Sequence, residues 1–168
     1  MIAKIFSTAL IALALTTGTA IAAQDGKYAE DGKYFDKNDE PTYNVKEDGT
    51  VDWYTYSGFR RYHSECHVCH GPDGLGSTYA PALIDTVKDL GYAEFIGIVA
   101  SGRERITAST TSKMPAFGDN VNVYCYIDDI YAYVLARAEN AVPRGRPRKR
   151  DPKPQGAKDY ENECRDGK

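Results

Sequence analysis

The chain has 168 residues, with 21 Lys and Arg against 24 Asp and Glu, and its net charge at pH 7 is −3. This length allows one domain with a modest core. The charge is uneven: residues 23–143 hold 11 basic and 19 acidic side chains, whereas residues 144–168 hold 9 basic and 5 acidic ones. We therefore expect an acidic body with a basic C-terminal tail, and the acidic body argues against nucleic acid as a partner.

Residues 1–22 have the layout of a secretory signal peptide. Lys4 precedes an apolar run from Ile5 to Leu15, and small residues follow up to Ala22. The run is too short to span a bilayer. We expect cleavage near Ala22 and a monomeric, soluble mature protein in the periplasm with no membrane span. Retention of the segment as a membrane anchor is the alternative. Export also removes contact with nucleic acid and permits disulfides.

Residues 23–51 are polar and rich in turns. Asp25-Gly26-Lys27-Tyr28 is echoed by Asp31-Gly32-Lys33-Tyr34, and a further Asp-Gly pair follows at Asp48. The pattern predicts an extended N-terminal arm, in which a short hairpin is an option. The helical domain is expected over residues 52–143.

A first helix is expected over about Ser57–Cys69, and it carries Cys66-His67-Val68-Cys69-His70. Cys-x-x-Cys-His is the sequence at which haem is covalently attached. Positions three and four apart share a helix face, so both thiols can reach the haem vinyl groups while His70 ligates the iron. A redox disulfide or half of a zinc site are the alternatives, but neither a βαβ context nor two further zinc ligands are evident. We therefore expect one covalent haem c.

Several glycines from Gly71 onward end this helix in a loop that leads to Pro81. A metal-bound histidine usually donates its other N–H to a fixed acceptor, and the carbonyl of Pro81 is the rigid candidate for His70. The alternative is an ordinary turn proline. A second helix is expected over about Gly91–Ser101, where apolar side chains recur at helical spacing and Gly102 provides the stop.

Met114 is the candidate for the second iron ligand, because Met1 leaves with the signal peptide and no other methionine remains. It is expected on a loop stiffened by Pro115. A thioether opposite an imidazole stabilises ferrous iron and raises the potential, as electron transfer requires. A core-filling methionine is the alternative, and His63 and His67 are the rival ligands. His63 shares a helix with His70 and cannot easily reach the opposite haem face.

The third and longest helix is expected over about Val121–Glu139, with Asn120 as its N-cap. Cys125 lies about 160° from the apolar stripe of this helix at 3.6 residues per turn. A cysteine on an outer face of an exported protein is exposed to oxidation unless it is paired. We expect a disulfide to Cys164 that clips the tail over this face; two free thiols are the alternative.

The tail, residues 144–168, is rich in charge and proline and shows no periodicity, so no regular structure is expected there. Its basic side chains would either dock an acidic partner or form a solvated, disordered run. Strand signals are weak throughout, and the fold class is predicted as mainly α. The basic cluster contains Arg144, Arg146, Arg148, Lys149 and Arg150.

These motifs together resemble the class I cytochromes c. The resemblance implies that the first and last helices cross at Gly58 and Tyr62, and that His70 and Met114 are the axial ligands, with the Pro81 carbonyl as acceptor. It also implies that partners dock at a largely uncharged haem edge. That edge would comprise Gly71, Pro72, Leu75, Gly76 and parts of the loop 114–117. The stretches that carry the resemblance are Gly58-x-x-x-Tyr62, Cys66–His70, Ala80-Pro81-Ala82-Leu83, Met114–Gly118 and Ala132–Leu135.

A narrower resemblance covers nearly the whole mature chain. The mature chain is similar to the methanol-metabolism-related, four-cysteine c-type cytochromes, whose role is similar to that of cytochrome cL. This implies a one-electron carrier, not an enzyme, that accepts electrons from a quinoprotein methanol or alcohol dehydrogenase and passes them to a downstream cytochrome c or oxidase. A general carrier to a terminal oxidase is the alternative, and a haem enzyme or sensor comes after it. The stretches that carry this resemblance are Val51–Tyr56, Gly71–Ser77 and Gly145-Arg146-Pro147, with the two extra cysteines.

Overall fold

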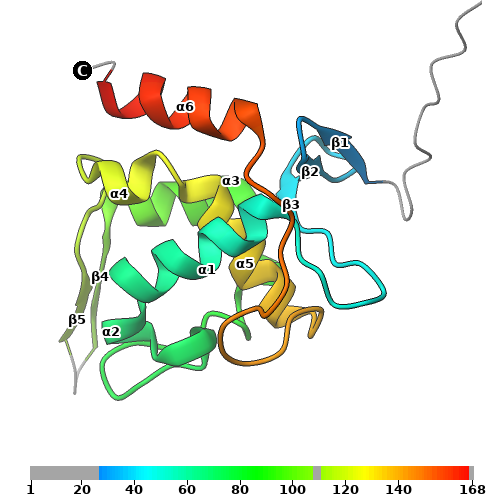
Figure 1. The fold of residues 1–168 in the computed structure, drawn as a ribbon. Helices are drawn as coiled ribbons and strands as arrows, with labels where there is room; N and C mark the ends of the chain where they lie inside the picture. The colour runs from blue at the N-terminus through cyan, green and yellow to red at the C-terminus, as the bar shows by residue number, and fades with distance from the viewer. Residues whose placement is uncertain (1–26, 108–110, 167–168) are drawn as a thin grey trace, which may run out of the picture.

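The computed structural model describes residues 27–107 and 111–166, so the expected signal peptide lies outside the described residues. Helices form most of the regular structure, which confirms the mainly α prediction (Figure 1). None of the helices in these ranges is long and apolar enough to cross a membrane. The helices are α1 (Trp53–Glu65), α2 (His67–His70), α3 (Val87–Ser101), α4 (Val121–Tyr124), α5 (Ile127–Ala138) and α6 (Gln155–Asp166), with a 3₁₀ turn η2 (Pro72–Gly74).

Helix α1 begins four residues earlier than expected, because Asp52 caps it. Its carboxylate accepts a hydrogen bond from the backbone N–H of Thr55 at 2.8 Å. The helix ends at Glu65, and the backbone at Cys66 departs from helical geometry with φ −110°. The haem motif therefore lies on the separate short helix α2 rather than on one continuous helix.

The crossing of α1 and α5 depends on Gly58. A Cβ atom at this position would lie 1.8 Å from the backbone oxygen of Asp129, so only glycine allows the two backbones to approach this closely. One turn further on, the rings of Tyr62 and Tyr133 pack with their centroids 5.6 Å apart. Gly58 and Tyr62 thus meet the last helix, as the class I resemblance implied.

Two other helices differ in their bounds from the expectation. In α3, Gly91 has φ +74°, so a separate turn over residues 87–90 precedes the expected helix. The stop at Gly102 is present, and its N–H donates to the carbonyl of Ile98. The expected long helix from Val121 is divided into α4 and α5, because Tyr126 has a non-helical backbone, and Asn120 caps α4.

The N-terminal arm contains the optional hairpin and one more strand. Strands β1 (Tyr28–Glu30), β2 (Lys33–Phe35) and β3 (Pro41–Thr42) form an antiparallel sheet in that order. The Nζ atom of Lys33 lies 2.5 Å from a carboxylate oxygen of Asp128, which ties this sheet to α5.

A second hairpin was not expected. Strands β4 (Arg103–Ile106) and β5 (Thr111–Met114) pair antiparallel, with Arg103 opposite Met114. Side chains on both of its faces are exposed, so no alternation of polar and apolar residues marks these strands in the sequence. The expected Met114 loop is therefore the end of a strand.

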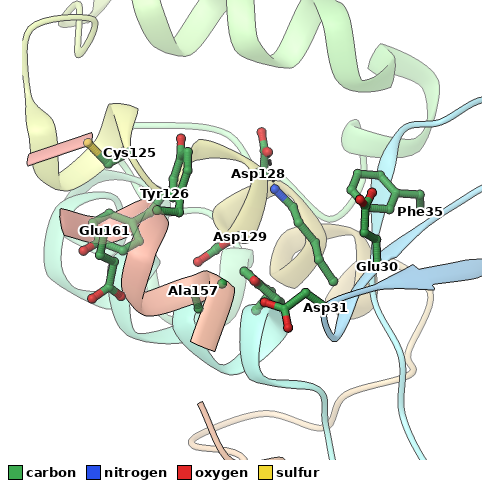
Figure 2. Close-up of a pocket in the computed structure, with 13 residues that line it drawn as sticks. Glu30, Asp31, Phe35, Cys125, Tyr126, Asp128, Asp129, Ala157 and Glu161 are labelled. Carbon is green, nitrogen blue, oxygen red and sulfur yellow. Dashed lines mark hydrogen bonds and ion pairs between the residues drawn. The ribbon is translucent and has the colours of Figure 1, made fainter. Parts of the chain in front are cut away.

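The tail also departs from the expectation of no regular structure, because residues 155–166 form α6. Cys164 of α6 is bonded to Cys125, which is 97% buried beneath the tail. Figure 2 shows the pocket of about 380 Å³ between α6, α5 and the N-terminal sheet. Five carboxyl groups line it, from Glu30, Asp31, Asp128, Asp129 and Glu161.

The buried apolar side chains form two clusters. The first lies between α1, α3, α4 and α5, and it contains Tyr62, Val87, Phe95, Val99, Val123, Ile127, Ile130, Tyr131, Tyr133, Val134 and Ala138. The second lies where the N-terminal arm, the start of α1 and the tail meet, and it contains Tyr43, Val51, Trp53, Tyr56, Ala136, Val142 and Ala157.

Candidate haem site

His70 is held by the loop that follows it. The side chain is 7% exposed, and Nδ1 lies 3.0 Å from the carbonyl oxygen of Pro81, where its N–H can donate. Of the two ring nitrogens, Nδ1 alone has a hydrogen-bond partner within the described ranges. This leaves the lone pair of Nε2 available to a metal, and the Pro81 contact fixes the tautomer and the ring orientation.

Two hydrogen bonds and one close backbone approach shape the loop from Gly71 to Pro81. The hydroxyl of Tyr62 donates to the Gly71 carbonyl at 2.6 Å, and the N–H of Gly76 donates to the His70 carbonyl at 2.7 Å. A Cβ atom at Gly76, whose φ is +82°, would lie 2.7 Å from the nitrogen of Ala82. The loop geometry that brings Pro81 to His70 therefore requires glycine at this position.

Cys66 and Cys69 lie on one helical turn with unbonded thiols. The N–H groups of Cys69 and His70 both point to the Cys66 carbonyl, at 3.2 and 3.0 Å. Cys69 is exposed, whereas Cys66 is partly buried, and burial raises the pKa of the Cys66 thiol to about 12. Both sulfurs are free to form thioether bonds, in contrast to the pair at Cys125 and Cys164.

Met114 is positioned by its backbone contacts with the end of α3. A Cβ atom at Gly102 would lie 2.7 Å from the Met114 oxygen, and Phe117 N–H donates to the Val99 carbonyl at 3.0 Å. The Met114 side chain is half-buried against the first cluster. These contacts fix the segment that carries Met114, and none of them involves the Met114 sulfur.

The donor set and the surrounding side chains fit a covalent haem. Two free thiols, one imidazole nitrogen and one thioether are the groups that such a haem binds. Several apolar side chains pack against the first cluster, as Cys66 does, but remain only partly buried, so an apolar group that covered them would complete their burial. They include Leu83, Ile84, Leu90, Ile96, Met114 and Phe117.

The buried Asp73 is a positioning residue that the sequence did not reveal. It adopts φ +60° next to Gly74 and accepts hydrogen bonds from the backbone N–H of Gly145 at 2.9 Å and the hydroxyl of Tyr133 at 3.3 Å. Burial raises its pKa, but the hydrogen bond from Gly145 and the guanidinium of Arg144 at 3.4 Å, together with the charges of Arg137 and His63, outweigh that effect and hold the pKa below its usual value. The Pro-Asp-Gly turn was the available signal.

The rival histidines lie together beside the motif. The ring of His63 packs on Phe59 and His67, and its Nδ1 lies 2.8 Å from the Phe59 carbonyl. Its Nε2 lies 3.7 Å from Asp73. Both nitrogens of His63 thus face protein groups. His63 and His67 are both partly exposed.

Three comparisons relate this chain to known proteins. Residues 55–134 match the family described as cytochrome c oxidase, cbb3-type, subunit III. The chain is 50% identical over 160 residues to cytochrome c-553I of Paracoccus denitrificans. The matched region covers 88% of this chain and 71% of that protein. It is 38% identical over 96 residues to cytochrome c-555 of Methylococcus capsulatus, covering 56% of this chain and 72% of that protein.

Among solved structures, the c-type cytochrome XoxG from Methylobacterium extorquens AM1 is similar, with a TM-score of 0.76, 56% identity and 86% of each chain covered. The chain is therefore a class I c-type cytochrome, an electron carrier with covalently bound haem c rather than an enzyme. It belongs to the same family as cytochrome c-553I and XoxG.

Proposed function

We propose that this cytochrome accepts electrons from a quinoprotein methanol or alcohol dehydrogenase in the periplasm and passes them to a downstream cytochrome c or oxidase. The observation that carries the proposal is the extent of the similarity to XoxG. It covers 86% of the chain, whereas the segment matched by the family model is residues 55–134. The similarity to XoxG therefore extends beyond the haem-binding segment into the arm or the tail. This favours a redox partner of the same kind for the two cytochromes.

Within this function, Cys66 and Cys69 would hold the haem by thioether bonds, and His70 and Met114 would bind its iron. Bound haem supplies the one-electron redox chemistry of its iron. The Pro81 carbonyl orients His70, and the soft sulfur of Met114 favours the reduced state. With both iron ligands supplied by protein groups, the site would suit electron transfer better than catalysis on a bound substrate.

The ligand assignment is tested by Met114→Ala in the holoprotein. We expect loss of the sulfur-to-iron absorption band near the red end of the visible spectrum, together with binding of added imidazole to the iron. His67→Ala is the matched control and should keep the band. A band that is missing from the wild type, or that survives Met114→Ala, would show that another residue is the ligand.

The donor is tested by mixing the oxidised cytochrome with reduced quinoprotein alcohol dehydrogenase from the same organism in a stopped-flow spectrometer. We expect a second-order rate constant of about 10⁵–10⁷ M⁻¹s⁻¹, as for specific protein association. If the dehydrogenase does not reduce the cytochrome but a terminal oxidase oxidises it rapidly, the chain is instead a general periplasmic carrier.

A further inference from the structure

The segment between α5 and α6, residues 144–154, forms no helix and is paired with the body at Arg150; we name it the strap (Figure 1). Arg150 pairs parallel with Val51, and the N–H of Asp151 donates to the Val51 carbonyl at 2.9 Å. Pro147 is buried. The basic residues of the tail are therefore not a disordered run, and their positions relative to the haem motif are defined.

The cations of the strap differ in their partners. Arg144 lies 3.4 Å from Asp73, and Lys149 lies 3.1 Å from Asp48. Lys153 is paired with Glu161. By contrast, no carboxylate of the described ranges lies within ion-pair distance of the other three. These are Arg146, Arg148 and Arg150.

Aromatic side chains hold two of these arginines without neutralising them. Arg146 donates to the Tyr56 hydroxyl at 2.6 Å, and the Arg150 guanidinium lies 4.8 Å from the Tyr56 ring and 5.1 Å from the Trp53 ring. Such contacts reduce the freedom of a guanidinium while its charge remains available. Burial raises the pKa of Tyr56, but the hydrogen bonds from Arg150 and Arg146 outweigh it and lower the pKa overall.

The same side chains line an open groove of about 730 Å³ on the surface. The groove is lined by Thr50, Tyr56, Arg146, Pro147, Arg148, Lys149 and Arg150. The start of the strap is bonded to the haem-motif loop, because Gly145 N–H donates to Asp73 at 2.9 Å. This contact places the positive surface next to the loop that contains the expected haem edge.

We propose that Arg146, Arg148 and Arg150 form a docking site for an acidic surface of the electron-donating dehydrogenase. The inference rests on the proposed function and adds how the donor is recognised. The guanidinium fork matches carboxylate geometry, and the remainder of the mature chain is acidic, so an acidic partner is drawn to the strap and repelled elsewhere. Binding there brings the donor beside the haem edge.

The test is the rate at which the reduced dehydrogenase reduces the Arg146→Gln/Arg148→Gln/Arg150→Gln variant. We expect a loss of about tenfold at ~10 mM ionic strength that shrinks to about twofold near physiological salt, since screening weakens electrostatic attraction. The matched control is Lys37→Gln/Lys158→Gln/Arg165→Gln, which removes the same charge from exposed sites on the turn after β2 and on α6. Its rate should stay within about twofold of wild type.

Two further variants separate charge from folding. Arg148→Glu removes an exposed side chain with no partner in the described chain, so it should fold normally and still slow reduction at low salt. Arg146→Lys/Arg148→Lys/Arg150→Lys keeps the charge and should retain most of the rate. The visible spectrum and the rate of reduction by a neutral hydroquinone should be unchanged in all variants.

The outcomes distinguish the two proposals. Equal rates for the wild type and the triple glutamine variant at every salt concentration would overturn the docking site and leave the donor assignment intact. A wild type that the dehydrogenase does not reduce would overturn both. Strap-dependent binding to anionic lipid vesicles with unchanged reduction rates would assign the strap to a membrane surface and overturn the docking site.

Discussion

The two apolar clusters of this cytochrome are built in different ways. The first is formed by helices whose apolar side chains recur at helical spacing, and both Cys66 of the haem motif and Met114 pack against it. The second joins segments that are far apart in the sequence, from Tyr43 through Trp53 to Ala157, and cations cover its aromatic rings. The first cluster thus shapes the redox site, whereas the second fastens the arm and the tail to it.

The largest effect is expected at the helix crossing beside the first cluster. Gly58→Ala places a methyl group 1.8 Å from the backbone oxygen of Asp129, so α1 and α5 must separate. We expect a loss of at least about 3 kcal/mol in the free energy of unfolding, measured by urea denaturation of the holoprotein.

Gly97→Ala in α3 is the matched control, because a Cβ atom there meets nothing within 4 Å. It should be neutral or should stabilise the protein by up to about 1 kcal/mol through helix propensity. Equal stabilities for the two variants would mean that the crossing is not as close as described.

A smaller effect is expected where the tail is fastened. The Cys125–Cys164 bond closes a segment with a sequence separation of 39. The double variant Cys125→Ser/Cys164→Ser should lose about 2–4 kcal/mol of stability. The haem absorption spectrum should not change, because the first cluster and the axial ligands are unaffected.

The disulfide itself is checked by mass analysis and alkylation. The mass of the native protein should increase by two protons on reduction. Neither cysteine should react with an alkylating reagent before reduction. Free thiols at these positions, or a spectrum that changes in the double variant, would contradict the division between the two clusters.

The smallest effect concerns Asp129, which lies between the crossing and the pocket of Figure 2. Burial raises the pKa of this carboxyl from 3.8 to about 7; Ser57 and Lys33 oppose the shift, and Asp128 and Asp52 add to it. Because the folded pKa lies above the unfolded one, stability falls as pH rises from about 4 to 7. Asp129→Asn should therefore raise stability by about 1–2 kcal/mol at pH 8 and change it little at pH 4.

Thermal unfolding at both pH values measures this difference. Asp85→Asn is the control, because Asp85 is exposed, and it should change stability equally little at both values. If Asp129→Asn destabilises the protein at pH 8, the buried carboxylate stabilises the folded state at this pH, which would contradict the prediction.

The division between the clusters also explains what the sequence could predict. Helix periodicity located the main part of α3 and the region of α4 and α5, and local spacing singled out Cys66, Cys69 and His70 as candidate haem-binding residues. Helix α6 was missed because its apolar face is short, with only Ala157, Tyr160 and Cys164 at helical spacing among charged residues, and of these only Ala157 is buried. Its position depends on Cys164 and on contacts with distant residues, which no local pattern encodes.

The site residues follow the same logic. The Pro81 carbonyl could be proposed because it follows the motif closely, and its contact with His70 needs one loop. Asp73 could not, because its role depends on Tyr133 and Gly145, which lie 60 and 72 residues further along the chain. The hairpin of β4 and β5 was missed because it buries neither face.

The pairing of Arg103 with Met114 has a consequence for how this protein can vary in evolution. Arg103 directly follows Gly102, so the position of Met114 is set from the α3 side and not by the residues that connect Ile106 to Thr111. Insertions or deletions in that connection would change the reach of the hairpin and leave the sulfur where it is. Variants of this protein that differ in length at this point are therefore expected to keep Met114 in place.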